Sequence, residues 1–373
     1  MNKENFFELF SRTSQPTPLL TNLSVLDKEL NGVLPPSIVS IEGPTQTGKT
    51  ESILKVIQKF ILPLEYGGHE SMVVLFDTDL RFEITRLTFL LEEHLVNFSE
   101  QNKNKNKKQK TQTSDGNLEI EEQTQLSEET LLNQTNKKNK GGDQKRINEI
   151  VKSSLSRLFV YRPITIDQFY YTLLWVQSFM KRNNNNRQFN STKVMSRDKV
   201  SQQRGTVNLQ DKISLIVIDS ISAFYWLDKT YPFRKQSLLS DEIPNLIAKI
   251  AEEFELLVFI TILQRTLSIK KQIKQAETHS YLPKKLTKKF NYSIILNHNK
   301  LSVHNVFNTG LSHHIRKHYY IAIMKTKKNS FTSQTYSYTI ENSGIQFEIA
   351  EQESDKDLDI ESENEIEKEN SIY

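Results

Sequence analysis

One short segment has the residue types and spacing of a phosphate-binding loop. It consists of Gly43, Pro44, Thr45, Gln46, Thr47, Gly48, Lys49 and Thr50, and reads G-x-x-x-x-G-K-[ST]. In such loops backbone N–H groups surround an anion, the lysine reaches the β- and γ-phosphates of ATP, and the hydroxyl binds Mg²⁺. An apolar run precedes the segment and apolar residues at helical spacing follow it, which favours a strand–loop–helix unit. The alternative is a chance match in a threonine-rich loop.

Three further polar residues, Asp79, Asp219 and Gln264, each follow an apolar run. The carboxyl ends of parallel strands meet at one edge of a sheet, so we expect these residues near the loop despite their distance along the chain. Asp219 is expected to hold Mg²⁺ through water, Asp79 to act as the base on the attacking water, and Gln264 to sense the γ-phosphate. The alternatives are a helix N-cap for Asp79, a turn-initiating Asp219 and an ordinary strand-end Gln264.

Apolar runs of strand length alternate with segments of helical periodicity. This order predicts an α/β fold with a mostly parallel, twisted sheet and helices on both faces. Three later segments alternate polar and apolar residues and predict C-terminal antiparallel strands. The expected parallel strands are residues 38–41, 72–76, 158–161, 213–218 and 256–263, and the antiparallel ones are residues 319–324, 335–340 and 345–349.

The chain of 373 residues is expected to hold one packed domain. We predict an irregular leader over residues 1–20, a core over 21–349 and an acidic, disordered tail over 350–373. Inserts rich in Asn, Lys and Gln at about residues 99–148 and 182–209 are predicted to be disordered, and the helix before the first should end near Asn97. The chain has no cysteine, which excludes disulfides, and it shows no secretory signal or long apolar segment, which favours an intracellular protein without a membrane span.

The net charge of +4 hides an asymmetry. Residues 351–373 contain ten acids and two lysines, so the rest of the chain carries 47 basic and 35 acidic residues, or +12. Eight of the basic residues lie between Arg265 and Lys289, and we expect six lysines there to neutralise DNA phosphates while Tyr281 and Phe290 stack on bases. The six are Lys271, Lys274, Lys284, Lys285, Lys288 and Lys289. A basic body with an acidic tail indicates a polyanion-binding surface that the tail could screen. The alternatives are a solvated basic loop and a tail that only keeps the protein solvated.

Several longer segments resemble the RecA-like recombinase paralogues. The approach to the loop contains Leu26-Asp27, Leu30 and Gly32, and Asp77-Thr78-Asp79 stands where that family has Asp-Thr-Glu. The resemblance covers roughly half of the chain, and the two Asn/Lys-rich inserts depart from it. Its other parts are ILPLEYGG (61–68), FDTDLRFEITRL (76–87), LIVIDSISAFYWLD (215–228) and SGIQFEI (343–349).

The resemblance implies a RecA-like P-loop NTPase core that binds ATP and Mg²⁺. It also implies an assembly subunit that partners the recombinase paralogues B, C and D, chiefly D, binds single-stranded or branched DNA, and acts in the nucleus in double-strand break repair by homologous recombination. The short leader agrees with a member that lacks the N-terminal helical DNA-binding domain. Because the side chain of Asp79 is one methylene shorter than the family's Glu, we expect weak or absent hydrolysis.

Two other functions compete with an assembly role. An active DNA-dependent ATPase would catalyse strand exchange itself, and Asp79 and the short leader argue against it. A phosphate-loop kinase for small molecules would need a second substrate pocket and an arginine-rich lid, and the sequence shows neither.

Overall fold

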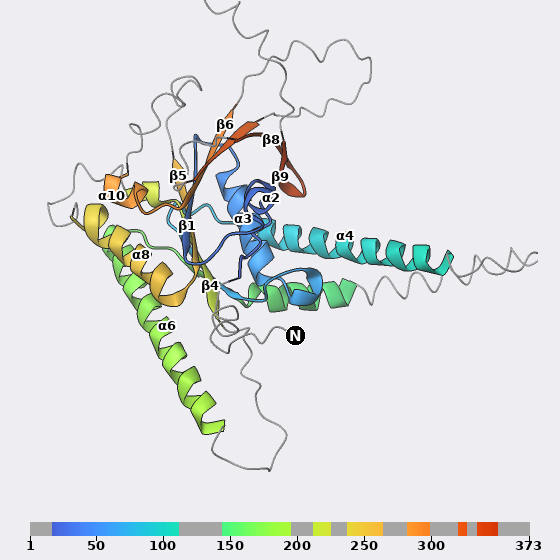
Figure 1. Cartoon of the computed structure of the whole chain (residues 1–373), viewed down its shortest axis with the longest axis horizontal. Coiled ribbons are helices and arrows are strands. Elements are labelled where there is room, and N and C mark those ends of the chain that lie inside the picture. The colour runs from blue at the N-terminus through green and yellow to red at the C-terminus, as the bar shows by residue number, and fades with distance from the viewer. Residues whose placement is uncertain are drawn as a thin grey trace, which may run out of the picture.

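The computed structural model describes residues 17–111, 144–194, 212–224, 237–263, 282–298, 320–326 and 334–349. Its strands are β1 (Ser37–Gly43), β2 (Met72–Asp77), β3 (Leu158–Tyr161), β4 (Ile213–Asp219), β5 (Leu257–Leu263), β6 (Tyr292–His298), β7 (Tyr320–Thr326), β8 (Gln334–Glu341) and β9 (Gly344–Ile349). They form one sheet in the order β3-β2-β4-β5-β1-β6-β7-β8-β9 (Figure 1). Strands β1 to β6 pair in parallel, and β7 to β9 continue the sheet antiparallel. The predicted fold class is confirmed.

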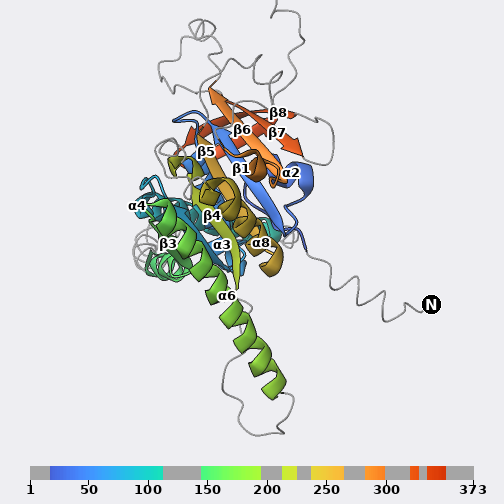
Figure 2. The same ribbon diagram turned by 90° about the vertical axis from the view of Figure 1, so that its left-hand side faces the viewer.

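Helices cover both faces of the parallel part of the sheet. One face packs against α2 (Ser24–Leu30), α3 (Lys49–Ile61) and α4 (Ile84–Thr111), and the other against α6 (Ile166–Val194) and α8 (Ile243–Phe254). Along β2, Val73 and Leu75 face the first layer while Val74 and Phe76 face the second, because successive side chains of a strand point to opposite sides. Figure 2 shows α6 and α8 in front of the sheet.

The start of α6 forms a capping box, with one difference from the usual pattern. Thr165 Oγ1 accepts a hydrogen bond from the backbone N–H of Gln168 at 3.2 Å, as an N-cap should. The Gln168 side chain accepts from the N–H of Ile164 at 2.9 Å, one residue before the usual donor. The cap therefore fixes the chain that enters the helix as well as the helix itself.

The predicted end of a helix near Asn97 was wrong. Helix α4 continues to Thr111 and α6 continues to Val194, so both enter the low-complexity inserts and project beyond the sheet (Figure 1). Lysine and glutamine favour helix, so such a composition can extend a helix that a core has already started. The end of the first insert also belongs to a helix over residues 144–155, where Val151 is buried against the core. Residues 112–143 and 195–211 lie outside the described part.

The missed elements include strand β6 and helix α2. Strand β6 pairs with β1 and β7, and its apolar run, which closely follows the basic segment, was assigned no structure. Helix α2 lies between Leu19 and Val33, which form an isolated bridge, so the leader joins the core just before the predicted boundary at residue 20. Among the residues that the structure describes, no helix has the length and apolar character needed to cross a membrane.

Candidate functional site

The phosphate-binding loop connects the carboxyl end of β1 to the first residue of α3. Gly48 precedes the helix with a φ of 85°, a left-handed conformation that suits glycine. A Cβ on Gly43 would lie 2.5 Å from the carbonyl oxygen of Leu296, so β6 leaves room only for glycine there. The Thr47 hydroxyl donates to the carbonyl of Pro44 at 2.9 Å and closes the loop. The helix N-terminus and the loop together form a place where an anion is favourable.

Lys49 places an ammonium group inside this loop. Its Nζ donates to the carbonyl oxygen of Gly43 at 2.9 Å and also to that of Pro44. Burial lowers the pKa of Lys49 to about 8, while the negative charges of Asp219 and Asp79 act in the opposite direction. An ammonium has three N–H donors, and its two carbonyl partners carry no charge that would neutralise it. The group is therefore suited to receive an anion.

The carboxylate of Asp219, at the end of β4, contacts the hydroxyl of Thr50. The Thr50 hydroxyl donates to Asp219 Oδ2 at 3.0 Å, although the two residues are 169 positions apart in sequence. Strand β5 lies between β1 and β4, and its Thr261 donates to Asp219 Oδ1. Burial raises the pKa of Asp219, and the hydrogen bonds from Thr261 and Thr50 favour its charged form. The sheet order thus brings the predicted metal-binding pair into contact.

Asp79 lies at the same edge with an exposed side chain. Its backbone N–H approaches the carbonyl oxygen of Asp219 at 3.4 Å. Partial loss of water raises the pKa of Asp79 first, and the negative charge of Asp219 adds to the increase. Helix α4 begins only at Ile84, so Asp79 is not its N-cap and that alternative was wrong.

Asp77, which the sequence analysis did not single out, organises the loop that carries Asp79. Its Oδ1 accepts from the backbone N–H groups of Arg81 at 3.0 Å and Phe82 at 3.3 Å. Its Oδ2 accepts from Arg162 Nε at 2.9 Å. The side chain of Asp77 is almost fully buried. An acidic residue as the last residue of an apolar strand is the sequence signal that could have identified it.

The residues present fit ATP and Mg²⁺. Mg²⁺ prefers oxygen ligands and usually takes one or two from protein and the rest from water and phosphate, and Thr50 and Asp219 offer a hydroxyl and a carboxylate side by side. Within the described ranges, no group of three His, Cys, Asp or Glu side chains is arranged to hold a metal by itself. A metal ion bound by Thr50 and Asp219 would take its remaining ligands from water and phosphate.

The predicted DNA-binding lysines are only partly described. Gln264, Lys271 and Lys274 lie outside the described residues. Lys284 and Lys285 belong to α10 (Lys284–Thr287), and Lys285 Nζ pairs with Asp241 Oδ1 at 2.6 Å.

Lys288 and Lys289 lie away from the phosphate-binding loop. They closely precede Asn291, whose backbone N–H donates to the carbonyl oxygen of Ile38 at 2.8 Å, near the amino end of β1. The loop follows the opposite end of that strand, about 16 Å further along it. Phe290 is buried in the core with an exposed fraction of 6%, so the prediction that it stacks on bases was wrong.

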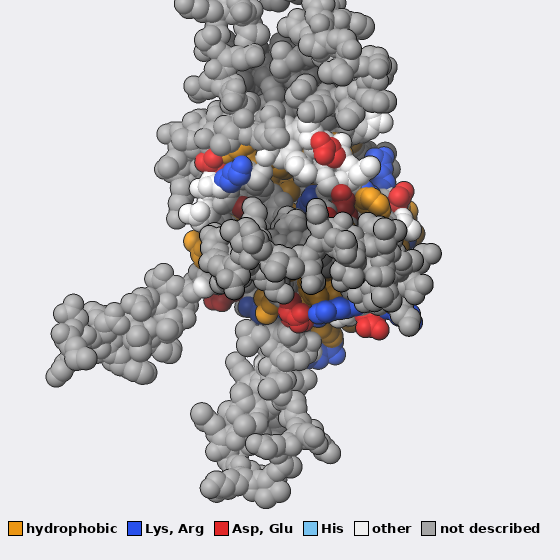
Figure 3. Space-filling view, turned by 90° about the vertical axis from the view of Figure 1, so that its right-hand side faces the viewer, with side chains coloured by type: hydrophobic (Ala, Val, Ile, Leu, Met, Phe, Trp, Pro, Cys, Tyr) orange, Lys and Arg blue, Asp and Glu red, His pale blue; other side chains and the backbone are white. Residues whose placement is uncertain are grey.

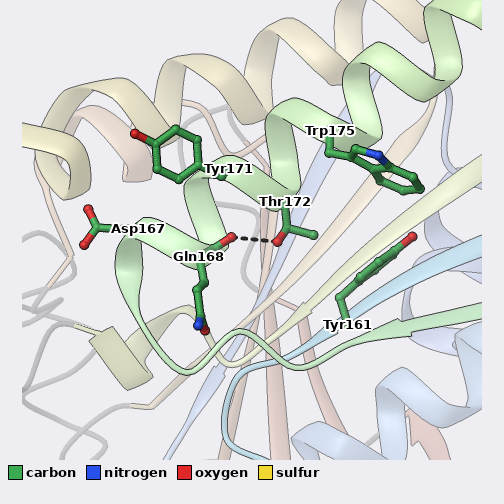
Figure 4. Close-up of a pocket in the computed structure, with 6 residues that line it drawn as sticks. All are labelled: Tyr161, Asp167, Gln168, Tyr171, Thr172 and Trp175. Atoms are coloured by element: carbon green, nitrogen blue, oxygen red, sulfur yellow. Dashed lines mark hydrogen bonds between the residues drawn. The ribbon is translucent and has the colours of Figure 1, made fainter.

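A second feature of the surface is an aromatic hollow beside the edge strand β3. It has a volume of about 480 Å³ and is lined by Tyr161, Asp167, Gln168, Tyr171, Thr172 and Trp175 (Figure 4). The rings of Tyr161 and Trp175 meet edge to face at 5.9 Å, and nearly half of the Trp175 side chain is exposed. Exposed apolar side chains next to an unpaired strand edge are suited to contact with another protein.

Comparison with known proteins agrees with this architecture. No family model matches the chain. The chain is 39% identical over 64 residues to the DNA repair protein XRCC2 of Mus musculus, a match covering 17% of this chain and 23% of that protein. It is 34% identical over 96 residues to the DNA repair protein RAD51 homolog 2 of Mus musculus, covering 25% and 27%, and 36% identical over 84 residues to the Homo sapiens protein of that name, covering 22% of each. The matches thus span about a quarter of these relatives. The sheet is therefore that of an α/β RecA-like core, and over these segments the chain is similar to XRCC2 and to RAD51 homolog 2.

Proposed function

We propose that this chain is an ATP-binding subunit of a recombinase-paralogue assembly that acts in DNA repair by homologous recombination. The observation that carries the proposal is the contact of Thr50 with Asp219 beside the ammonium group of Lys49. Lys49 and Thr50 begin α3 and Asp219 ends β4, so the three groups meet only in the folded chain. The relatives, all named as DNA repair proteins, support the process in which the site would act.

In this proposal each residue of the site has a separate role. Lys49 would bind the β- and γ-phosphates, and Thr50 and Asp219 would hold Mg²⁺, which neutralises phosphate charge when bound. Asp79 would orient water at the γ-phosphate, and Gln264 would respond to that phosphate. The shorter side chain of Asp79 favours binding over hydrolysis, because a displacement of about 1 Å can cost on the order of a hundredfold in rate.

The surface supports an assembly role. The hollow joins exposed aromatic rings to β3, the edge strand of the sheet within the described residues, and a partner chain would bury both. We propose the recombinase paralogues B, C and D as the partners, chiefly D, and the nucleus as the compartment.

We also propose that the chain contacts single-stranded or branched DNA, on the basis of its basic segment. Eight Lys and Arg residues lie between Arg265 and Lys289 with one acid among them. On the described part of the face shown in Figure 3, basic and acidic side chains are interspersed. The proposed DNA contact is therefore assigned to the basic segment itself, with Lys271, Lys274, Lys284, Lys285, Lys288 and Lys289 as the phosphate-binding residues.

Nucleotide binding tests the proposal directly. A fluorescent ATP analogue with Mg²⁺ would be titrated into the full chain, purified with its partners, and into Lys49→Ala. Loss of a charged contact to phosphate should weaken binding by about ten- to a hundredfold. Lys59→Ala is the matched control, because Lys59 is also a half-buried lysine of α3 but donates to Gly67 at 2.6 Å, away from the loop. Equal affinity of the wild type and Lys49→Ala would refute ATP binding at this site.

Turnover separates the assembly role from an active ATPase. We expect the wild-type complex to hydrolyse ATP slowly, and Asp79→Glu to raise the rate because the longer side chain extends the carboxylate toward the attacking water. Phosphate release with and without single-stranded DNA measures both. A fast, DNA-stimulated wild-type rate that Asp79→Glu does not raise would favour the active enzyme instead.

A further inference from the structure

The C-terminal hairpin formed by β8 and β9 lies directly on the phosphate-binding loop. The Tyr338 hydroxyl of β8 donates to the carbonyl oxygen of Thr47 at 2.7 Å, and both residues are buried. Next to this bond, a Cβ on Gly48 would lie 2.9 Å from Ile340 and 3.2 Å from Ile345, so the backbone of Gly48 touches both strands of the hairpin. Strand β9 also runs beside α2 and α3 (Figure 1).

The hydrogen bond from Tyr338 sets the direction of a loop amide. Thr47 and Gly48 share one planar trans peptide, in which the C=O and the N–H point in opposite directions. While Tyr338 holds the Thr47 carbonyl, the Gly48 N–H must point away from the hairpin. Glycine rotates easily about its backbone bonds, so this peptide has little intrinsic preference for that orientation. The Gly48 N–H opens the helix N-terminus, where backbone donors face an anion.

A second contact ties the turn of the hairpin to the same helix end. Arg86 of α4 donates to both carboxylate oxygens of Glu51, at 2.9 and 3.1 Å, and Glu51 directly follows Thr50. The same guanidinium donates to the carbonyl oxygens of Asn342 at 2.9 Å and Glu341 at 3.2 Å in the hairpin turn. A planar, forked cation of this kind fixes the relative position of the groups it joins. The hairpin and the start of α3 are therefore held at two points.

We propose that Tyr338 and Arg86 are positioning residues for the nucleotide, which act through the Thr47–Gly48 peptide and through Glu51. Docking of the hairpin then orients the loop donors, and nucleotide binding in turn stabilises the docked hairpin, because such a coupling is reciprocal. The inference rests on the proposed binding of ATP. It predicts that a substitution in β8 or β9 that disturbs the docked hairpin alters the affinity for nucleotide.

The sheet supplies a matched control for the test. Tyr336 lies on the same strand and face as Tyr338, with the same exposed fraction of 1%, but its hydroxyl donates to Glu29 of α2 instead of the loop. Tyr336→Phe and Tyr338→Phe each remove one hydroxyl from one buried tyrosine, so both should lower the melting temperature. Tyr338→Phe should also weaken binding of the fluorescent ATP analogue by about fivefold, the effect of one hydrogen bond, while Tyr336→Phe should leave it within about twofold.

Hydrogen exchange gives a readout that a purely structural role would not change. With Mg²⁺ and ATP, amides of the wild-type hairpin over residues 336–347 should exchange more slowly, and Tyr338→Phe should lose much of this protection. If Tyr338→Phe does not fold, Arg86→Gln replaces it, with Arg157→Gln as the control because Arg157 pairs with Glu70 at 2.8 Å instead. Equal affinities for Tyr336→Phe and Tyr338→Phe would overturn the inference while leaving ATP binding intact. Failure of the wild type to bind ATP would overturn the proposed function, and this inference with it.

Discussion

The ammonium group of Lys49 is partly buried, and this brings its pKa close to neutral pH. Burial lowers its pKa from 10.5 to about 8. Below pH 8 the group is protonated in the folded and unfolded chain alike, and its burial then costs stability. Between pH 8 and pH 10.5 the unfolded chain binds more protons, so this cost disappears as pH rises.

We predict that ATP affinity falls as pH rises through about 8, because the neutral amine no longer attracts phosphate. The loss should be roughly tenfold between pH 7 and pH 9, as expected for the titration of one group. Titrations of the fluorescent analogue at these pH values measure it. Lys49→Arg is the control, since its guanidinium stays charged throughout, and its affinity should not depend on pH over this range. A wild-type affinity that is equally flat would contradict the assignment.

At the residue scale, the sequence predicted the groups that a local motif or a strand end identifies. Lys49 and Thr50 follow from the loop pattern, and Asp219 from its place after an apolar run. Tyr338 could not be predicted in the same way, because its partner Thr47 lies 291 residues away and no local spacing connects them.

The loop between β2 and α4 depends on one buried carboxylate. Asp77 accepts two backbone N–H groups of this loop, and Arg162 pairs with it from a more exposed position. The loop carries Asp79, so the geometry of the catalytic candidate follows from Asp77. The stability of this loop therefore also bears on the position of Asp79.

We predict that Asp77→Ala lowers the free energy of unfolding by about 2–4 kcal/mol, because two N–H groups lose a charged acceptor and one of them is buried. Arg162→Ala removes the ion pair and the hydrogen bond from Arg162 to the carbonyl oxygen of Phe82, but it leaves the two N–H contacts of Asp77, and it should cost about 1 kcal/mol. Urea unfolding of both variants measures the difference. Equal losses would show that the ion pair, and not the backbone contact, stabilises this loop.

The elements themselves were largely predictable, and the failures have physical reasons. Strands β1, β2, β4 and β5 are continuous apolar runs because both faces of the sheet are covered there, so their positions were predicted correctly. The ends of α4 and α6 were not predicted correctly. Their sequences become polar but remain rich in residues that favour helix, so nothing in them marks where the helix ends. Strand β6 was hidden because the basic residues before it dominated that part of the sequence.

At the scale of the whole molecule, charge is unevenly distributed along the chain. Residues 351–373 carry ten of the 45 acids and two of the 49 basic residues, and the rest of the chain has a net charge of +12. A polyanion is attracted to the net positive part and repelled by the tail, and both effects weaken with salt. We therefore expect the negative charge of residues 351–373 to oppose the proposed DNA binding.

We predict that deletion of residues 351–373 strengthens DNA binding by the complex several-fold at low salt. The difference should fade toward 1 M salt, where the Debye length is about 3 Å and distant charges no longer act on each other. Fluorescence anisotropy with labelled single-stranded DNA over a salt series measures both. A tail of the same length with its acids replaced by Asn and Gln is the control, and it should behave like the deletion if charge is the cause. Unchanged affinity in both variants would show that the tail does not oppose DNA, and that the basic segment does not bind DNA through net charge.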